Sequence, residues 1–199
     1  MLWSSPLFWI AVAILLFWAR GAYNRLMRLR SAVAQSFGGF DAHMVRLVAL
    51  LGEFDAAQEV QRGLAPTDAG GQEIAALQGA TIQLSASLAV ARARPLDVDA
   101  VAALVAARDV LQASWRSAMG KLQPSVSTPD GAQTAQEPPE LAVTALLSIW
   151  QVRWDEHTVQ NEQAIRVFNE AVRYYNAAIV QFPANLLAWV FGFKAARSL

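Results

Sequence analysis

A run of eighteen residues without a charged side chain, from Leu2 to Ala19, limits what this chain can fold into. An α-helix rises about 1.5 Å per residue, so the run would span roughly 27 Å, close to the ~30 Å hydrocarbon core of a bilayer. Ser5 followed by Pro6 suits the N-cap and the first helical position. We therefore predict that residues 1–22 form a transmembrane anchor.

A cleaved signal peptide is the alternative interpretation of this run. Ala19-Arg20-Gly21 loosely fits the small-x-small cleavage pattern, but no Lys or Arg precedes the apolar residues, as is usual in a signal peptide. A retained anchor is therefore favoured.

Because basic side chains follow the run and none precedes it, the positive-inside rule predicts that the N-terminus is outside and the body cytoplasmic. The basic residues that follow are Arg20, Arg25, Arg28 and Arg30.

Composition excludes several classes of function. The chain of 199 residues is 55% hydrophobic and 16% charged, which is more apolar than a typical soluble domain. Basic and acidic residues are equal at 16 each, so no overall positive charge indicates a nucleic-acid partner. The absence of cysteine excludes disulfides, thiol catalysis and Cys-based zinc sites.

Beyond the anchor, apolar residues recur at steps of three and four, as on one face of an α-helix. The first such stripe runs from Leu26 to Phe54 and crosses Gly38-Gly39, which we interpret as a local bend or a close approach of another helix. A turn at 65–71 and another at 94–97 separate two further helices, the later one capped by Asp97. Residues 122–139 contain four prolines and are predicted to form a long mobile loop.

A fourth helix is predicted from about Pro139 to Phe182. Pro183 should end it, and Asn185 should cap a short final helix that either packs back on the bundle or touches lipid headgroups. The predicted fold is all-α, with an N-terminal transmembrane helix, a long antiparallel four-helix bundle within 23–199 and a short apolar C-terminal helix. The seam typical of a bundle or coiled coil comprises Ile165, Phe168, Val172, Tyr175, Ile179 and Phe182.

The C-terminal stretch Phe168-Asn169-Glu170-Ala171-Val172-Arg173-Tyr174-Tyr175-Asn176, followed by Phe182-Pro183 and Gly192-Phe193, resembles the LemA family of bacterial membrane-anchored proteins. The stretch from Tyr23 to Arg30 is similar to the family's post-membrane motif, and Phe40-Asp41 is similar to its Ile-Asp pair. The resemblance implies a long antiparallel bundle on a single-pass anchor in the bacterial inner membrane, without an established biochemistry. Some relatives serve in membranes of bacterial organelles such as magnetosomes, and others occur beside a membrane metalloprotease.

The chain departs from the family pattern in its middle. Residues 46–52 replace the basic pair and the Asp-Leu-Ile-Pro run that follow the family's Ile-Asp pair. The family's mid-chain Tyr-Pro element is missing, and the proline-rich loop lies in that region. The chain therefore resembles a divergent member.

Three aromatic-Asn pairs are the main candidates for a functional site. Asn169 and Asn176 are seven residues apart and therefore lie on one side of a helix, and Asn24 follows Tyr23 at the other end of the chain. They predict inter-helix hydrogen bonds that fix register or, as the alternative, a polar strip for a ligand or partner helix. The full set of candidate interaction or register residues is Tyr23, Asn24, Asp41, Phe168, Asn169, Tyr175, Asn176, Phe182, Pro183, Gly192 and Phe193.

No pattern indicates catalysis, a cofactor or a metal. His43 and His157 each have an acid two residues away, a spacing that points the two side chains to different faces of a helix. No nucleophile elbow, Walker loop or dinucleotide-binding glycine pattern occurs. We therefore expect neither enzyme activity nor a cofactor.

Three functions remain, in order of preference. The first is a membrane-anchored helical scaffold that organises partner proteins or copies of itself at the bilayer surface. The second is an accessory subunit of a membrane protease or stress-response system, which rests on the family association alone. The third is a small-molecule-binding or enzymatic bundle. The expected partners are the lipid bilayer, through the N-terminal helix and as an alternative also the C-terminal segment, and an unidentified protein or second copy.

Overall fold

The computed structural model describes residues 6–64, 70–123, 138–182 and 184–199. Over these residues the chain is mostly helical and contains no strand, so the all-α prediction is confirmed. The helices in chain order are α1 (Pro6–Leu64), α2 (Gly71–Ala93), α3 (Val98–Leu122), α4 (Pro138–Ile179) and α5 (Ala184–Phe191).

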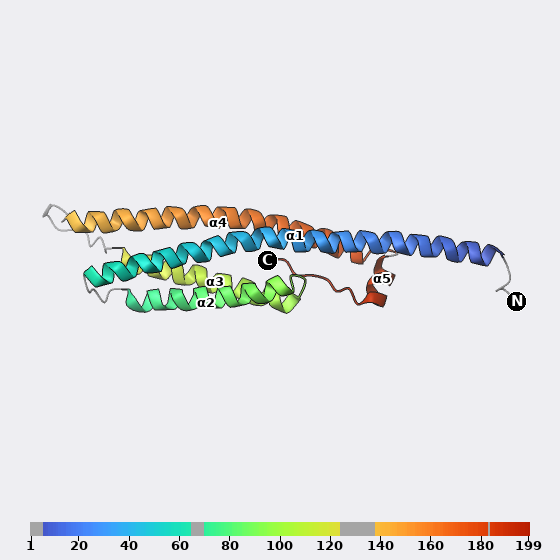
Figure 1. Cartoon of the computed structure of the whole chain (residues 1–199), viewed down its shortest axis with the longest axis horizontal. Coiled ribbons are helices and arrows are strands. Elements are labelled where there is room, and N and C mark those ends of the chain that lie inside the picture. The colour runs from blue at the N-terminus through green and yellow to red at the C-terminus, as the bar shows by residue number, and fades with distance from the viewer. Residues whose placement is uncertain (1–5, 65–69, 124–137, 183) are drawn as a thin grey trace.

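The first helix is one continuous element from the predicted anchor into the body of the protein. α1 has 59 residues, so it extends over roughly 88 Å. Figure 1 shows α4 beside α1 in the opposite direction, with α2 and α3 along the C-terminal half of α1 and α5 near its N-terminal half. The main packing contacts join α1 to α4 and α2 to α3.

The predicted stripes supply the buried core. Phe40 and Met44 of α1 are fully buried, and Phe37 packs against Phe168 of α4 with ring centroids 5.8 Å apart. Trp115 of α3 joins the same core, because its ring lies 5.2 Å from that of Phe54 on α1. Burial of each such side chain stabilises the fold by roughly 1.5–3 kcal/mol.

The ends of the middle helices follow the predicted turn chemistry. The carboxylate of Asp97 accepts a hydrogen bond from the backbone N–H of Asp99 at 3.0 Å, which confirms it as the N-cap of α3. The predicted proline-rich loop is shorter than residues 122–139, since Leu122 ends α3 and Pro138 begins α4. Its centre, 124–137, and residues 65–69 of the preceding turn lie outside the described residues.

Two predictions at the end of α4 are wrong. The helix ends at Ile179, so Phe182 leaves the seam and is 72% exposed. Asn185 does not cap α5, because the helix begins at Ala184 and the backbone N–H of Asn185 donates to the carbonyl of Gln181 at 2.9 Å. Pro183, the expected helix stop, lies outside the described residues.

Helix α2 is a second apolar segment of suitable length. One helix of the described part, α2, is long and apolar enough to cross a membrane by length and composition. Its apolar face, however, includes the fully buried Leu84 and Ala91 and packs against α3. Arg92 near its end pairs with Asp41 of α1 at 2.7 Å. These contacts make α2 a helix of the core.

Of the two interpretations of Gly38-Gly39, the close approach of another helix is wrong, and the local bend stays a prediction. α1 continues through both residues, both are exposed, and a Cβ added at either would meet no atom within 4 Å. The pair lies away from the buried stripe that contains Phe37 and Phe40. The two glycines therefore cost α1 backbone entropy without a packing benefit.

We predict that G38A/G39A raises the free energy of unfolding by about 1–2 kcal/mol, because each Ala restricts the unfolded chain and fits the helix. Urea unfolding of the full chain in detergent measures the change. Gly70→Ala is the control and should destabilise, since Gly70 has a φ of 84° and its added Cβ would lie 3.2 Å from Leu122. An unchanged or lower stability of G38A/G39A would show that α1 needs this flexibility.

Candidate functional site

After α5 the chain turns back along α4. Gly192 has a φ of 68°, and the backbone N–H of Phe193 donates to the carbonyl of Ala188 at 2.9 Å. A left-handed glycine followed by this bond is the Schellman arrangement that ends a helix, and its left-handed position favours a residue without a Cβ. The predicted site residue Gly192 therefore starts an extended tail, residues 193–199.

The two predicted asparagines of α4 hold this tail by its backbone. The side-chain amide of Asn176 donates to the carbonyl of Ala196 and accepts from its N–H, both at 2.8 Å. Asn169 makes the same pair of bonds to Leu199, at 3.0 and 2.8 Å. The hydroxyl of Tyr175 donates to the carbonyl of Lys194 at 3.1 Å. We call Asn169, Tyr175 and Asn176 the tail clamp.

The distance between Asn169 and Asn176 along α4 matches the distance between their partners Leu199 and Ala196 along the tail. Seven residues along a helix advance roughly 10.5 Å, and three residues of extended chain advance roughly 10 Å. Asn169 and Asn176 can therefore each pair with one of two tail residues that are three apart. The expected inter-helix bonds are replaced by bonds to an extended segment, which the helical pattern of the sequence did not indicate.

Every third tail side chain packs toward the helices. Ala196 is buried, and Phe193 and Leu199 are half-buried against the core. The guanidinium of Arg30 lies 5.9 Å from the ring centroid of Phe193. Burial raises the pKa of Tyr175, and the positive charge of Arg30 lowers it in part. Tyr175 is therefore a neutral hydrogen-bond donor at physiological pH.

The remaining predicted site residues do not join the tail clamp. Asn24 is exposed and makes no side-chain hydrogen bond to another described residue, so it belongs to no polar strip with the asparagines of α4. Phe168 is a core residue. Asp41 makes a bidentate ion pair with Arg92, whose pKa is raised first by the hydrogen bonds and then by the charge of Asp41.

Tyr23 and Phe182 instead lie at the anchor end of the molecule. The ring centroid of Tyr23 lies 5.4 Å from that of Phe191, and that of Phe182 lies 5.2 Å from that of Trp18. These ring contacts join the start of α1 to the end of α4 and to α5. We define the anchor end as residues 8–30 with residues 178–193.

Large apolar side chains are exposed over the anchor end. α5 buries its small residues Ala184 and Ala188, half-buries Leu187 and exposes its other large apolar residues, with Trp189 82% exposed. The exposed apolar residues of the anchor end are Phe8, Trp9, Ile10, Ile14, Leu15, Leu16, Phe17, Trp18, Met27, Val180, Phe182, Leu186, Trp189, Val190 and Phe191. Such a patch on a water-soluble surface would be unusual, and it indicates contact with a partner or a membrane.

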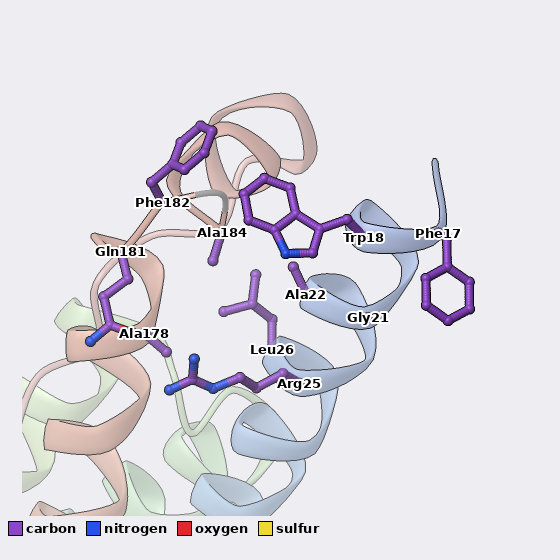
Figure 2. A pocket seen from close by; sticks show the side chains of 10 residues that line it. All are labelled: Phe17, Trp18, Gly21, Ala22, Arg25, Leu26, Ala178, Gln181, Phe182 and Ala184. Atoms are coloured by element: carbon purple, nitrogen blue, oxygen red, sulfur yellow. The ribbon is translucent and has the colours of Figure 1, made fainter. Parts of the chain in front are cut away.

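A cavity of about 270 Å³ lies within the anchor end. Figure 2 shows Trp18 and Phe182 closing one side of it, Leu26 pointing into it and Phe17 pointing away. Arg25 reaches from α1 toward Ala178 of α4. Arg25 is the one charged residue among those that line the cavity.

Charge is distributed unevenly along the chain, a signal that the balanced total conceals. All 16 acidic residues lie between Asp41 and Glu170. The residues before and after this range carry only basic charges, Arg20, Arg25, Arg28, Arg30, Arg173, Lys194 and Arg197. The anchor end therefore has a positive local charge, which would have been visible in the sequence by comparing its ends with its middle.

Helix α4 carries a second apolar stripe on its outer side, which the sequence pattern also contained. The stripe consists of five residues that follow one another at steps of three, seven, eight and seven, and each is more than half exposed. They are Ile149, Val152, Val159, Val167 and Tyr174. At 100° per residue they face away from the buried Phe168 and Val172. We call these five residues the outer stripe.

The described residues contain no group of three or more His, Asp or Glu side chains arranged to hold a metal ion. Another cavity, of about 810 Å³, lies between Arg30, the turn between α2 and α3, and Lys194. Its carboxylates are Asp97 and Asp99, of which Asp97 already caps α3. This arrangement offers no nucleophile paired with a base.

Comparisons with protein-family models, with curated proteins and with solved structures find no match to the chain. The LemA resemblance therefore stays a prediction.

We predict that N169A/N176A releases the tail. Each Asn makes two partly buried bonds to the tail, and we expect the double variant to lose about 2 kcal/mol of unfolding free energy. Amide hydrogen exchange at Ala196 and Leu199 should become fast. Asn185→Ala is the control, because this exposed Asn makes no side-chain hydrogen bond to another described residue. Unchanged protection of both amides would contradict the clamp.

Proposed function

We propose that this protein is a single-pass membrane scaffold, a divergent LemA-type chain that holds partner proteins or copies of itself at the bilayer surface. In this proposal α1 begins as a transmembrane helix and continues into an antiparallel four-helix bundle with α2, α3 and α4. The observation that carries the proposal is the concentration of exposed large apolar side chains at the anchor end.

Exposure along the first turns of α1 supports anchoring there. Ile14, Leu15 and Leu16 are 65%, 63% and 64% exposed, so the rest of the described chain leaves these three side chains uncovered. Transfer of such side chains from water to an apolar medium is favourable by roughly 25 cal/mol per Å². α2 differs, because its apolar face is already packed against α3 and leaves little reason to enter a bilayer.

The orientation of α5 supports a second contact with the membrane surface. α5 runs transverse to the long helices in Figure 1, so it would lie in the plane of a bilayer that α1 crosses. Its ring contact with Tyr23 puts Phe191 just beyond the uncharged run. A helix with exposed Trp, Leu and Phe next to basic residues is typical of an interfacial helix. This favours the lipid-contact alternative for the final helix while Ala184 and Ala188 still pack against the body.

The outer stripe supports the scaffold part of the proposal. Four of its five residues are aliphatic and β-branched, and steps close to seven are those of a coiled-coil seam. α4 is therefore apolar on two opposite sides, with one side facing the core and the other available to a partner helix. No observation on the described residues favours the accessory-subunit or the enzymatic alternative.

Matched arginine substitutions test which helix crosses the bilayer. Ile10 lies near the centre of the uncharged N-terminal run and Ile82 near the centre of α2, and their side chains are 56% and 71% exposed. An Arg at the centre of a span costs about 3 kcal/mol, so Ile10→Arg should shift the insertion equilibrium about 100-fold and release protein on carbonate extraction. Ile82→Arg should remain in the membrane fraction. The reverse pattern would assign the span to α2 and remove the proposal.

Glutamate substitutions test the outer stripe. V152E/V159E should abolish site-specific cross-links from α4 to a partner or a second copy in native membranes, because two charges would enter an apolar helix contact. Thermal unfolding should be nearly unchanged, since both side chains are exposed. The control V90E/V110E changes exposed valines on α2 and α3 and should keep the cross-links. A chain that is never cross-linked to any partner would contradict the scaffold function.

A further inference from the structure

The cavity at the anchor end has one cationic group and otherwise neutral walls. The guanidinium of Arg25 forms neither an ion pair nor a hydrogen bond with a described residue. The lining also offers the Trp18 indole, whose nitrogen faces the cavity in Figure 2. Gln181 lines the cavity too, but Figure 2 shows its amide nitrogen pointing away from Trp18 and Leu26. The guanidinium and the indole N–H are hydrogen-bond donors, and the lining apart from these two residues and Gln181 is apolar or glycine.

The cavity lies at the depth of the lipid headgroups if α1 crosses the bilayer as proposed. Arg25 is six residues beyond Ala19, the end of the uncharged run, so its Cα lies roughly 9 Å beyond the hydrocarbon edge. Figure 2 shows the guanidinium extending sideways from α1 toward Ala178, so it stays at about the depth of its own Cα. The headgroup layer is roughly 5–7 Å thick on each side. The charge of Arg25 is therefore expected beside the outer edge of the headgroup layer, next to the phosphates.

We propose that this cavity binds the phosphate of an anionic phospholipid, with Arg25 as the principal contact; this inference rests on the proposed membrane anchoring. A guanidinium is suited to a phosphate because its planar array of N–H groups matches two phosphate oxygens. The Trp18 N–H supplies a further donor. The acyl chains remain in the bilayer beside Phe17, which points away from the cavity.

The volume of the cavity and the positive charge of the anchor end determine which class of ligand fits. A volume of about 270 Å³ is slightly below the roughly 300–1,000 Å³ of sites for whole drug-sized ligands, so it suits a headgroup and not a complete lipid. No acidic residue occurs before Asp41 or after Glu170, so no carboxylate of the anchor end competes with the phosphate for Arg25. The surrounding basic residues favour a net negative lipid over a zwitterionic one.

Native mass spectrometry of the full-length protein in a neutral detergent tests the site. We titrate it with phosphatidylglycerol, with phosphatidylcholine and, separately, with inorganic phosphate. Wild type should retain one phosphatidylglycerol, and Arg25→Gln should weaken this binding by about tenfold, as expected for loss of one charged hydrogen-bonding partner. Arg28→Gln is the matched control, since Arg28 is an exposed arginine on the same helix and does not line the cavity.

A second variant tests whether binding needs the open volume of the cavity in addition to the charge of Arg25. Ala22→Trp fills the cavity while it leaves Arg25 in place, and it should also weaken phosphatidylglycerol binding. Circular dichroism verifies that both variants remain helical. Equal binding by wild type and both variants would overturn the site. Equal retention of phosphatidylcholine would overturn its preference for anionic lipid, and equally tight binding of inorganic phosphate would assign it to a soluble anion.

Failure of this site is distinguishable from failure of the anchor. Arg25→Gln should remain in the membrane fraction after carbonate extraction, because the uncharged run is unchanged. Loss of lipid retention with intact anchoring supports the site. Wild-type protein that is fully extracted by carbonate would overturn the anchoring proposal and this site with it.

Discussion

The burial of one apolar stripe along α1 is the constraint on which the rest of the structure depends. α1 is a single helix of 59 residues, and its stripe contacts α4 over much of its length. Phe37 packs on Phe168, and Phe54 packs on Trp115, so the same helix organises both of its neighbours. Because a helix of this length has no break at residue 22 or at Gly38-Gly39, the direction of its first turns determines the direction of the whole body.

The C-terminal segment depends on that arrangement in two ways. The ring contacts of Phe182 and Phe191 with α1 hold α5 at the anchor end, where most of its large side chains stay exposed. The chain then reverses at Gly192, and the tail clamp fixes its last residues on α4. A short apolar helix would have little stability alone, and its position comes from contacts on both of its sides.

The sequence predicted the elements whose signal is local. Buried residues at steps of three and four identified the core of α1, α2, α3 and α4, and Asp97 was recognisable as a cap from its neighbours alone. The errors concern long-range partners. Phe182 continued the apolar period although the helix had ended, and Asn169 and Asn176 were expected to bind a helix although their partner is an extended tail thirty and twenty residues away. The Arg25 cavity was missed because it combines α1 with α4 and α5.

The sequence alone determined that the chain is all-helical, which faces of its helices are apolar and that its charge is separated between ends and middle, since periodicity and composition are properties of neighbouring residues. Only the tertiary structure decided which apolar residues stay exposed. α5 buries its alanines and exposes Trp189, and α4 leaves Val152 and Val159 uncovered. The physical reason is that burial depends on which surfaces meet, and a helical period is the same whether or not a partner covers it.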